Sequence, residues 1–351
     1  MTESGSVVLV TGGAGFIGTQ LVRRLVGAGC DAHVVDNLHP QVHGDPHDGR
    51  YVPGPGHTFH AMDVRSAESW TALLRTLRPA TIVHLAAETG TGQSLREASR
   101  HATTNVVGTT EMLDALTRTG SLPDRIILTS SRAVYGEGQW VLDDGRVFSP
   151  GARPAAMLEA GIWEPRGPGG EPARPAPNIA GLTPTAPTNV YAATKLAQEH
   201  VLSAWCSAMA VDLRVRRLQN VFGAGQSLGN PYTGVLTFFA RLAAAGETIP
   251  VFEDGGIVRD FVHVGTVVAA LERALEDDIA LADVGSGEVA RLVDVAATIA
   301  AHAGAPEPKI TGQFRLGDVR AAGASDLADA EGVVSFLPHL DELLAWASSR
   351  A

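Results

Sequence analysis

Two side chains that could move a proton, Tyr191 and Lys195, stand four residues apart in the segment Tyr-Ala-Ala-Thr-Lys. On a helix this spacing puts both on one face. A phenol acts as a base only when its pKa falls below the usual value of about 10, and a neighbouring ammonium favours the phenolate. Taken alone, the pair is more typical of a helix surface, so its meaning depends on the rest of the chain.

A hydroxyl group that could assist this pair ends an apolar run, Ile126-Ile-Leu-Thr-Ser-Ser131. Parallel sheets bind their ligands at the carboxyl ends of the strands. We therefore predict that Ser131 hydrogen-bonds a reacting oxygen, with Ser130 directly behind it. Ordinary turn chemistry is the alternative for both serines.

A glycine-rich segment follows the apolar run at residues 7–10, with the spacing G-x-x-G-x-x-G. Gly12 permits a tight turn, Gly15 lets the backbone approach a pyrophosphate, and Gly18 lets a helix pack close to the strand. The amides at the start of that helix face the anion. A plain glycine turn is the alternative to this dinucleotide site. The predicted cofactor contacts here are Gly12, Gly15, Phe16, Ile17 and Gly18.

Asp36 follows the next strand-like run, Ala32–Val35, where a carboxylate can accept both hydroxyls of an adenosine ribose. A 2′-phosphate at this place would meet a negative charge with no arginine beside it. The sequence therefore favours NAD over NADP. Asp63 and Val64 are candidates for the adenine edge, although a solvated turn aspartate is an almost equal alternative.

The elements that must position these residues alternate in the first half of the chain. Apolar runs that are not interrupted by polar residues are typical of parallel strands buried on both faces, so we predict an α/β fold of the Rossmann type, with a doubly wound parallel sheet. The expected strands are Val7–Val10, Ala32–Val35, Thr81–Leu85, Arg125–Thr129 and Leu213–Leu218. The expected helices are Gly18–Val26, Ala67–Leu77, Asn105–Leu116, Val190–Met209, Thr233–Ala245, Gly265–Glu276 and Leu340–Ser348.

The predicted domains are discontinuous. Residues 1–220 and about 259–285 form the dinucleotide-binding domain, and residues 221–258 and 286–351 form a smaller mixed α/β domain that binds the substrate. The Pro- and Gly-rich segment 137–187 is too long for a simple connection. It is predicted to be an insertion that either covers the substrate or is partly mobile.

The composition excludes several classes of protein. The net charge of −11 gives no electrostatic reason to bind nucleic acid or an anionic membrane, and no apolar run is long enough for a membrane helix. Two cysteines, Cys30 and Cys206, do not support a disulfide framework. The N-terminal residues lack the pattern of a signal peptide, so we expect a cytoplasmic protein. His39, His43 and His47 lie in one loop, but their spacing fixes no metal geometry, and no metal is predicted.

Together these motifs resemble the extended short-chain dehydrogenase/reductases, and within them the nucleotide-sugar epimerases and dehydratases, closest to the dTDP-L-rhamnose 4-epimerase-like branch. The matching pieces span nearly the whole chain in the order of the family. They are Thr11–Gly18, Asp36–Leu38, Asp63-Val64, His84–Ala87, Asn105–Thr109, Ser130–Gly136, Tyr191–Lys195, Leu218–Asn220, Arg259–Val264 and Arg315–Asp318.

The resemblance implies roles for further residues. It implies a catalytic set of Ser131, Tyr191 and Lys195, with Tyr191, Lys195 and Ser130 also beside the cofactor. It adds cofactor contacts at Asn37, Leu85, Ala86, Ala87 and Asn105. It implies that the substrate, a nucleotide-linked sugar, contacts Glu88, Thr89, Thr91, Ser131, Arg132, Asn220, Tyr232, Arg259, Arg315 and Asp318. Asn220, Arg259 and Arg315 correspond to groups that bind the diphosphate, which suits the guanidinium fork. A homodimer is also implied.

The residues after Ser131 narrow the reaction. The family's 4,6-dehydratases use an Asp-Glu pair there, but this chain has Arg132 and Ala133, neither of which is a carboxylic acid. The sequence therefore predicts an NAD-dependent nucleotide-sugar 4-epimerase, which oxidises C4, lets the keto sugar rotate and reduces it again. The alternatives are a reductase of an NDP-4-keto-6-deoxy sugar and, more remotely, a 4,6-dehydratase or a non-catalytic NAD-binding regulator.

Overall fold

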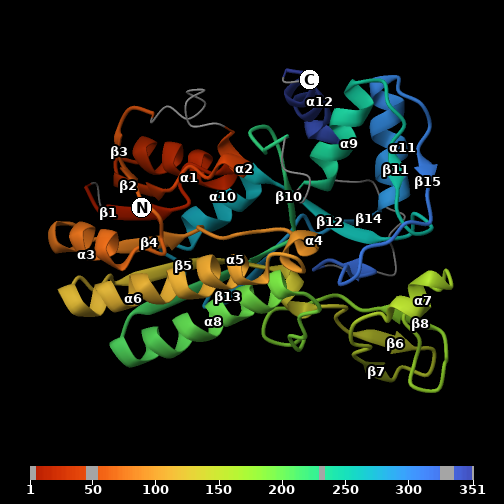
Figure 1. The fold of residues 1–351 in the computed structure, drawn as a ribbon, viewed down its shortest axis with the longest axis horizontal. Coiled ribbons are helices and arrows are strands. Elements are labelled where there is room, and N and C mark those ends of the chain that lie inside the picture. Colours follow the sequence, from red (N-terminus) through yellow and green to blue (C-terminus); the bar gives the residue numbers. More distant parts are fainter. Residues whose placement is uncertain (1–4, 45–53, 229–233, 325–335, 350–351) are drawn as a thin grey trace.

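The computed structural model describes residues 5–44, 54–228, 234–324 and 336–349. Its centre is a parallel sheet of seven strands in the order β13-β9-β5-β4-β1-β2-β3 (Figure 1). This confirms the predicted doubly wound α/β fold. The strands are β1 (Val7–Thr11), β2 (Asp31–Asp36), β3 (His57–Ala61), β4 (Thr81–His84), β5 (Arg125–Ser131), β9 (Asp212–Leu218) and β13 (Leu281–Val284).

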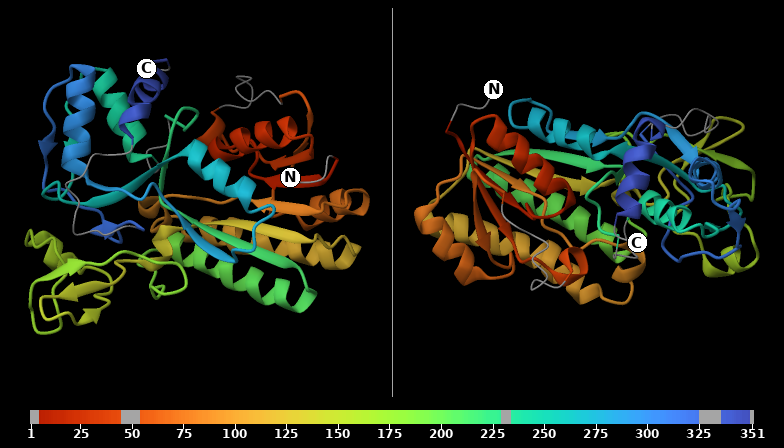
Figure 2. Two further views of the ribbon diagram at one scale, coloured as in Figure 1. Left: turned by 180° about the vertical axis from the view of Figure 1, so that it is seen from behind. Right: turned by 90° about the horizontal axis from the view of Figure 1, so that it is seen from above.

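Helices cover both faces of this sheet (Figure 2). One apolar layer holds Val8 and Val10, and the opposite layer holds Leu9, because successive side chains of a strand point to opposite faces. Since both faces are buried, both must be apolar, which is why the strands are uninterrupted apolar runs. The covering helices are α1 (Phe16–Gly27) and α10 (Val264–Arg273) on one face, and α3 (Ala67–Thr76), α6 (Gly108–Thr119) and α8 (Val190–Met209) on the other.

A smaller mixed α/β unit stands beside the carboxyl ends of the large sheet. Its apolar core includes Phe222, Phe239, Phe261 and Phe336, which come from well-separated parts of the chain. Its strands are β10 (Asn220–Phe222), β11 (Pro250–Val251), β12 (Val258–His263), β14 (Val289–Arg291), β15 (Lys309–Ile310) and β16 (Ala321–Ala322), and its helices are α9 (Val235–Ala244), α11 (Leu292–Ala303) and α12 (Leu340–Ser348).

The segment 259–285, expected to belong to the dinucleotide-binding domain, divides between the two units. Strand β12 pairs with β10, β14 and β16 in the smaller unit. Helix α10 packs in the apolar layer that also holds α1, and β13 forms one edge of the large sheet. The chain therefore crosses between the units within this segment.

The insertion 137–187 folds into a small antiparallel sheet, in the order β7-β6-β8, with one short helix. A buried group of ion pairs joins it to the smaller unit: Arg153 contacts Glu137 and Glu253, both at 2.8 Å, and Arg320 contacts Glu253 at 2.8 Å. These four residues are called the insertion network below. The elements are β6 (Trp140–Leu142), β7 (Val147–Phe148), β8 (Ala173–Pro175) and α7 (Ala155–Glu159).

The remaining elements are short and lie around the carboxyl ends of the sheet. A π-helical turn joins α5 to α6, so the expected helix from Asn105 begins earlier and contains an irregular turn. These elements are α2 (Pro40–His43), α4 (Thr91–Ser94), α5 (Ala98–Ala102), the π turn Thr103–Val107 and the 3₁₀ turns Arg132–Tyr135 and Leu337–His339.

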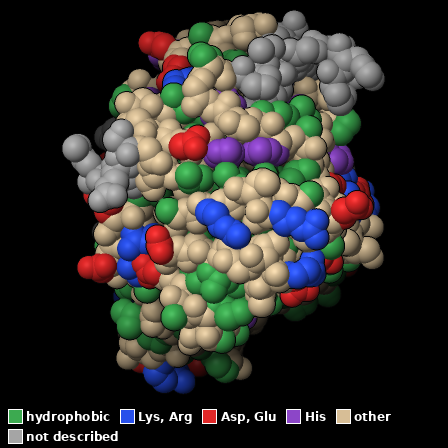
Figure 3. Space-filling model, turned by 90° about the vertical axis from the view of Figure 1, so that its left-hand side faces the viewer, with side chains coloured by type: hydrophobic (Ala, Val, Ile, Leu, Met, Phe, Trp, Pro, Cys, Tyr) green, Lys and Arg blue, Asp and Glu red, His purple; other side chains and the backbone are tan. Residues whose placement is uncertain are grey.

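The surface of the described residues shows no marked separation of charge on the side that faces the viewer in Figure 3. Basic side chains there stand among acidic and hydrophobic ones. Among the described helices, none has the length and apolar character needed to cross a membrane.

Candidate active site

A cleft of about 440 Å³ lies between the carboxyl ends of the large sheet and the smaller unit. Its floor is the glycine turn after β1 together with the residues that end β2, β4 and β5. Its opposite wall comes from residues 218–222 and 226–236, as far as the structure describes them. This is where ligands bind in open parallel sheets.

The glycine turn has the shape that a bound pyrophosphate needs. Gly12 has a φ of +67°, and a Cβ there would lie 2.8 Å from the backbone nitrogen of Ala86. At Gly18, a Cβ would lie 2.5 Å from the carbonyl oxygen of Gly12. Gly15 caps helix α1 without a side-chain hydrogen bond, so the first amides of the helix remain available to an anion. The turn therefore fits the phosphates of NAD.

Asp36 ends β2 with its carboxylate in the cleft. The backbone amides of Ala14 and Leu38 donate to its two oxygens, at 3.1 and 2.9 Å, and fix its orientation. Asp63, by contrast, does not line the cleft. Its carboxylate accepts a bidentate hydrogen bond from Arg65, at 2.8 and 2.7 Å, which lowers the pKa of Asp63 to about 2.

Ser131 and Tyr191 meet in the cleft, from the end of β5 and the first turn of α8. Asn189 caps α8 by accepting a hydrogen bond from the amide of Ala192 at 2.9 Å, which fixes the start of the helix at Val190. Burial raises the pKa of Tyr191, while a hydrogen bond with Ser131 and the charge of Arg132 oppose this rise. In this structure the charge of Arg132 therefore favours the ionised phenol, and the role of Lys195 toward Tyr191 stays a prediction.

Lys195 lines the same cleft but turns toward a buried polar group behind it. Its Nζ donates to Oε1 of Gln198 at 2.6 Å, and Gln198 contacts His84 and Thr109. Burial lowers the pKa of Lys195 to about 7, against the nearby carboxylate of Glu199. Burial also lowers the pKa of His84 to about 3, so this histidine is neutral, in agreement with a structural role.

Arg132 reaches across the cleft from the turn after β5. Its Nε donates to Oδ1 of Asn220 at 2.8 Å. Apart from this bond, no described residue hydrogen-bonds its guanidinium, and the side chain lines the cleft. A guanidinium with free N–H groups in a cleft suits a phosphate or an oxygen-rich ligand.

The site can now be compared with known proteins. The model of the NAD dependent epimerase/dehydratase family matches residues 8–151 and 167–283. This chain belongs to that family.

Individual relatives agree with this membership. The dTDP-L-rhamnose 4-epimerase of Burkholderia thailandensis is 47% identical over 351 residues, which cover 97% of this chain and 95% of that protein. The UDP-glucose 4-epimerase of Mycolicibacterium smegmatis is 30% identical, over 89% of this chain and 87% of that protein. The structure of the Thermus thermophilus UDP-glucose 4-epimerase in complex with NAD matches with a TM-score of 0.73 and 27% identity, covering 98% of this chain and 99% of that one.

Membership of the epimerase/dehydratase family confirms the resemblance that the motifs indicated, and with it NAD as the cofactor. The predicted class of enzyme, a nucleotide-sugar 4-epimerase, is confirmed by the same relatives.

The cleft brings together most of the predicted site residues of this family member. From the cofactor set, these are Gly12, Gly15, Phe16, Ile17, Gly18, Asp36, Asn37, Val64, Leu85, Ala86, Ala87, Ser130, Tyr191 and Lys195. From the substrate set, they are Glu88, Thr89, Thr91, Ser131, Arg132 and Asn220.

Other predicted residues lie away from the cleft. Asn105 is fully buried and binds the backbone of Glu88, so it supports the wall of the cleft from behind. Arg259 is buried, and its guanidinium donates to the carbonyl oxygens of Val258 and Val319, both at 2.7 Å. Asp318 lies 3.8 Å from Arg259, and Arg315 is exposed over the ring of Phe252. Tyr232 lies outside the described residues.

The structure also adds cleft residues that the sequence did not reveal. His39, Val42 and His43 line the cleft beside Asp36, and Nε2 of His43 lies 3.6 Å from a carboxylate oxygen of Asp36. These residues belong to a four-residue helix and its cap, which are too short to show a periodic pattern. Gln226 contributes to the opposite wall. Only their position shortly after the motif Asp36–Leu38 could have indicated a role for His39, Val42 and His43.

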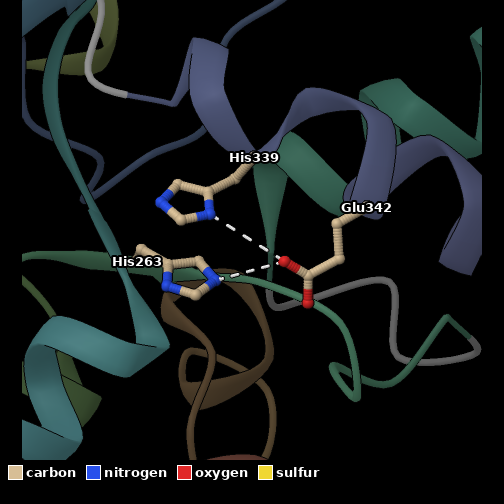
Figure 4. Close-up of side chains that lie close together, drawn as sticks. All are labelled: His263, His339 and Glu342. Carbon is tan, nitrogen blue, oxygen red and sulfur yellow. Dashed lines mark ion pairs between the residues drawn. The ribbon is translucent and has the colours of Figure 1, made fainter.

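His263, His339 and Glu342 form a separate cluster on the smaller unit, shown in Figure 4. The two imidazole rings are stacked, with centroids 3.7 Å apart and planes 2° from parallel. A metal bound by both would lie far outside the plane of at least one ring, whereas a histidine nitrogen binds along its lone pair, in the ring plane. In addition, Nδ1 of His263 accepts a hydrogen bond from Gly265 and caps α10. The geometry is that of a structural pair of histidines.

Proposed function

We propose that this enzyme is an NAD-dependent 4-epimerase whose substrate is a dTDP-linked 6-deoxyhexose of the rhamnose class. The observation that carries the proposal is the meeting of Ser131 and Tyr191 at the glycine-turn cleft, in a chain 47% identical to a dTDP-L-rhamnose 4-epimerase. The absence of acids after Ser131 supports epimerisation over 4,6-dehydration, since Arg132 and Ala133 occupy those positions.

The residues of the cleft have different roles in the reaction. Tyr191 takes the proton of the sugar 4-hydroxyl as hydride leaves C4, and returns it after the keto sugar has turned. Ser131 holds the same oxygen and hydrogen-bonds the phenol. Arg132, beside Tyr191 and bonded to Asn220, favours the ionised phenol and binds the substrate. When bound, NAD supplies a two-electron acceptor that takes hydride from C4 and gives it back on the opposite face.

The other residues hold the cofactor. The amides after Gly15 bind the pyrophosphate, and Asp36 accepts the hydroxyls of the adenosine ribose. Lys195 binds the nicotinamide ribose. Arg259 and Arg315 stay candidates for the diphosphate, and Asp318 for a ribose, only if the smaller unit changes position, because none of them lines the cleft as it stands.

The test is a product analysis with a panel of nucleotide sugars. The purified enzyme with NAD is incubated with dTDP-L-rhamnose and with UDP- and GDP-hexoses, and the C4 configuration is followed by NMR. We expect a mixture of C4 epimers from the dTDP-6-deoxyhexose with no net change in the absorbance of reduced cofactor. Stoichiometric consumption of NADH by a 4-keto sugar would instead establish the reductase.

We also propose a homodimer located in the cytoplasm. Cys30 and Cys206 are both buried and are not joined in a disulfide, which is compatible with a reducing compartment. Sedimentation analysis of the purified protein, together with fractionation of the source cells, tests both parts. A monomer at micromolar concentration would contradict the first.

A further inference from the structure

Helix α2 forms one wall of the cofactor cleft with little packing to hold it there. It has four residues, and none of them is buried. His39, Val42 and His43 nevertheless line the cleft beside Asp36. Because apolar burial is the main source of local stability, a helix this short and this exposed depends on polar contacts for its position.

Arg100, on α5, supplies such contacts. Its Nη2 donates to Oε1 of Gln41 at 3.0 Å and to Oε2 of Glu88 at 2.9 Å, and lies 3.4 Å from Nε2 of His39. Its Nη1 donates to Glu97 at 2.9 Å. A single guanidinium thus joins α2 to Glu88, and both segments line the cleft.

A second contact runs parallel to the first. The side-chain amides of Gln41 and Gln93 exchange two hydrogen bonds, of 2.8 and 3.0 Å, and Gln93 also donates to Glu97 at 3.0 Å. Gln93 is almost fully buried. Gln41 therefore connects α2 to two residues of the neighbouring segment, Gln93 and Arg100.

The backbone of Glu88 is itself anchored, through Asn105, to the helix α8 that carries Tyr191 and Lys195. The side chain of Asn105 accepts a hydrogen bond from the amide of Glu88 at 2.7 Å and donates to its carbonyl oxygen at 3.0 Å. Nδ2 of Asn105 also donates to Oγ1 of Thr194 at 2.9 Å, and Thr194 precedes Lys195 on α8. The anchored side is rigid, so the contacts of Arg100 fix α2 against it.

We propose that Arg100 is a positioning residue that retains NAD in the cleft, by holding α2 against Glu88 so that these two cleft-lining segments keep their places. Arg100 does not line the cleft, so it acts through α2 and Glu88. Retention fits an epimerase, in which oxidised cofactor is restored in each cycle and no step requires its exchange. The proposal rests on NAD as the family's cofactor and is independent of the identity of the sugar.

The experiment measures loss of NAD in the absence of sugar. The NAD-loaded full-length enzyme is freed of excess nucleotide by rapid desalting, and the protein-bound NAD is followed with time for the wild type and for Arg100→Met, Arg100→Lys and Gln41→Leu. We expect Arg100→Met to release NAD at least about tenfold faster, equivalent to ~1.4 kcal/mol. The rate for Arg100→Lys should be intermediate, because an ammonium can still pair with Glu88 but lacks the planar fork of donors that also reaches Gln41.

The matched control is Arg118→Met. Arg118 also donates from Nη1 to a neighbouring side chain, Thr71, but away from the cofactor cleft. It should release NAD at the wild-type rate.

Melting temperatures with and without NAD separate positioning from a general loss of stability. Arg100→Met should melt like the wild type without NAD and gain less on adding it, and excess NAD should restore turnover. A wild-type rate of release in both Arg100→Met and Gln41→Leu would overturn the proposal. So would a drop in melting temperature that is equal with and without NAD.

Discussion

Two regions of this molecule remove ionisable side chains wholly or partly from water. In one region these side chains form ion pairs with one another, and in the other they do not. In the insertion network, the side chains of Arg153, Glu137 and Glu253 are 2%, 1% and 1% exposed, and each carboxylate faces a guanidinium at 2.8 Å. In the cleft, Lys195 is buried and Tyr191 and Arg132 are half-buried, but no carboxylate forms an ion pair with any of them within the described residues.

The difference separates structural charges from functional ones. A buried ion pair costs much to break, because the remaining partner stays buried without compensation. The groups of the cleft have no ion-pair partner, so burial displaces their pKa values against weaker opposing contacts, that of Lys195 to about 7. Even in the network, burial raises the pKa of Glu137 to about 7, against the charge of Arg153.

The largest effect should come from Tyr191→Phe, which removes the proton acceptor and leaves the shape of the cleft almost unchanged. We expect turnover to fall by at least ~10³-fold, in the range of general acid–base catalysis. The NAD content after desalting should stay that of the wild type. Retained epimer formation by NMR would show that another group takes the proton.

Breaking the insertion network should lower the free energy of unfolding by about as much as Tyr191→Phe raises the activation free energy. Arg153→Met leaves Glu137 and Glu253 without their shared partner, and we expect the free energy of unfolding in urea to fall by about 3–5 kcal/mol. The exposed pair of Arg146 and Asp144 offers the control, since Arg146→Met should leave the urea midpoint unchanged. Equal midpoints for both variants would contradict the contrast between the regions.

Arg132→Met tests whether the open guanidinium of the cleft serves the substrate. Because a hydrogen bond to a charged group contributes about 1.5–3 kcal/mol, the KM for the nucleotide sugar should rise by roughly 10- to 100-fold. Arg315→Ala should change KM by less than about threefold, since Arg315 is exposed over Phe252 and outside the cleft. The reverse ranking would place the diphosphate at Arg315, as the family resemblance implied.

The last test concerns the pH dependence of stability without NAD. Lys195 has a pKa of about 7 in the fold and 10.5 in the unfolded chain. Between these values the unfolded chain holds a proton that the folded one does not, so this group makes the free energy of unfolding rise with pH. Lys195→Met should therefore exceed the wild type in stability near pH 6.5, with the advantage shrinking toward pH 10. A constant difference in urea titrations would refute this assignment.

Much of this arrangement could be predicted from the sequence, because local patterns determined it. The strands β1, β2, β4 and β5 were visible as apolar runs, and the glycine turn with Asp36 indicated the cofactor. Strand β3, His57–Ala61, lies at one edge of the sheet and has no fully buried residue, and β13 joins the opposite edge from a distant part of the chain. Edge strands show the weakest apolar pattern, and β13 was not predicted.

The predicted site residues that lie outside the cleft are engaged by other protein groups. Asp63 is held by Arg65, and Arg259 by carbonyl oxygens of residues 258 and 319. The insertion was predicted to cover the substrate or to be partly mobile. In the structure it forms a small sheet that Arg153 attaches to the smaller unit, and none of its residues 137–187 lines the cleft. A motif shows which residue types are present, but the partners that engage a charged side chain emerge only with the tertiary structure.

The order in which the chain leaves the ribosome gives one further consequence. The large sheet is complete once β13 has emerged at Val284, whereas the core of the smaller unit also needs Phe336, Leu340 and Leu343. Since domains tend to fold as units during synthesis, a nascent chain can hold a finished dinucleotide site before the smaller unit, which forms the opposite wall of the cleft, has folded. Newly made enzyme can therefore load its cofactor first, and a ribosome-bound chain stalled soon after β13 should already retain NAD.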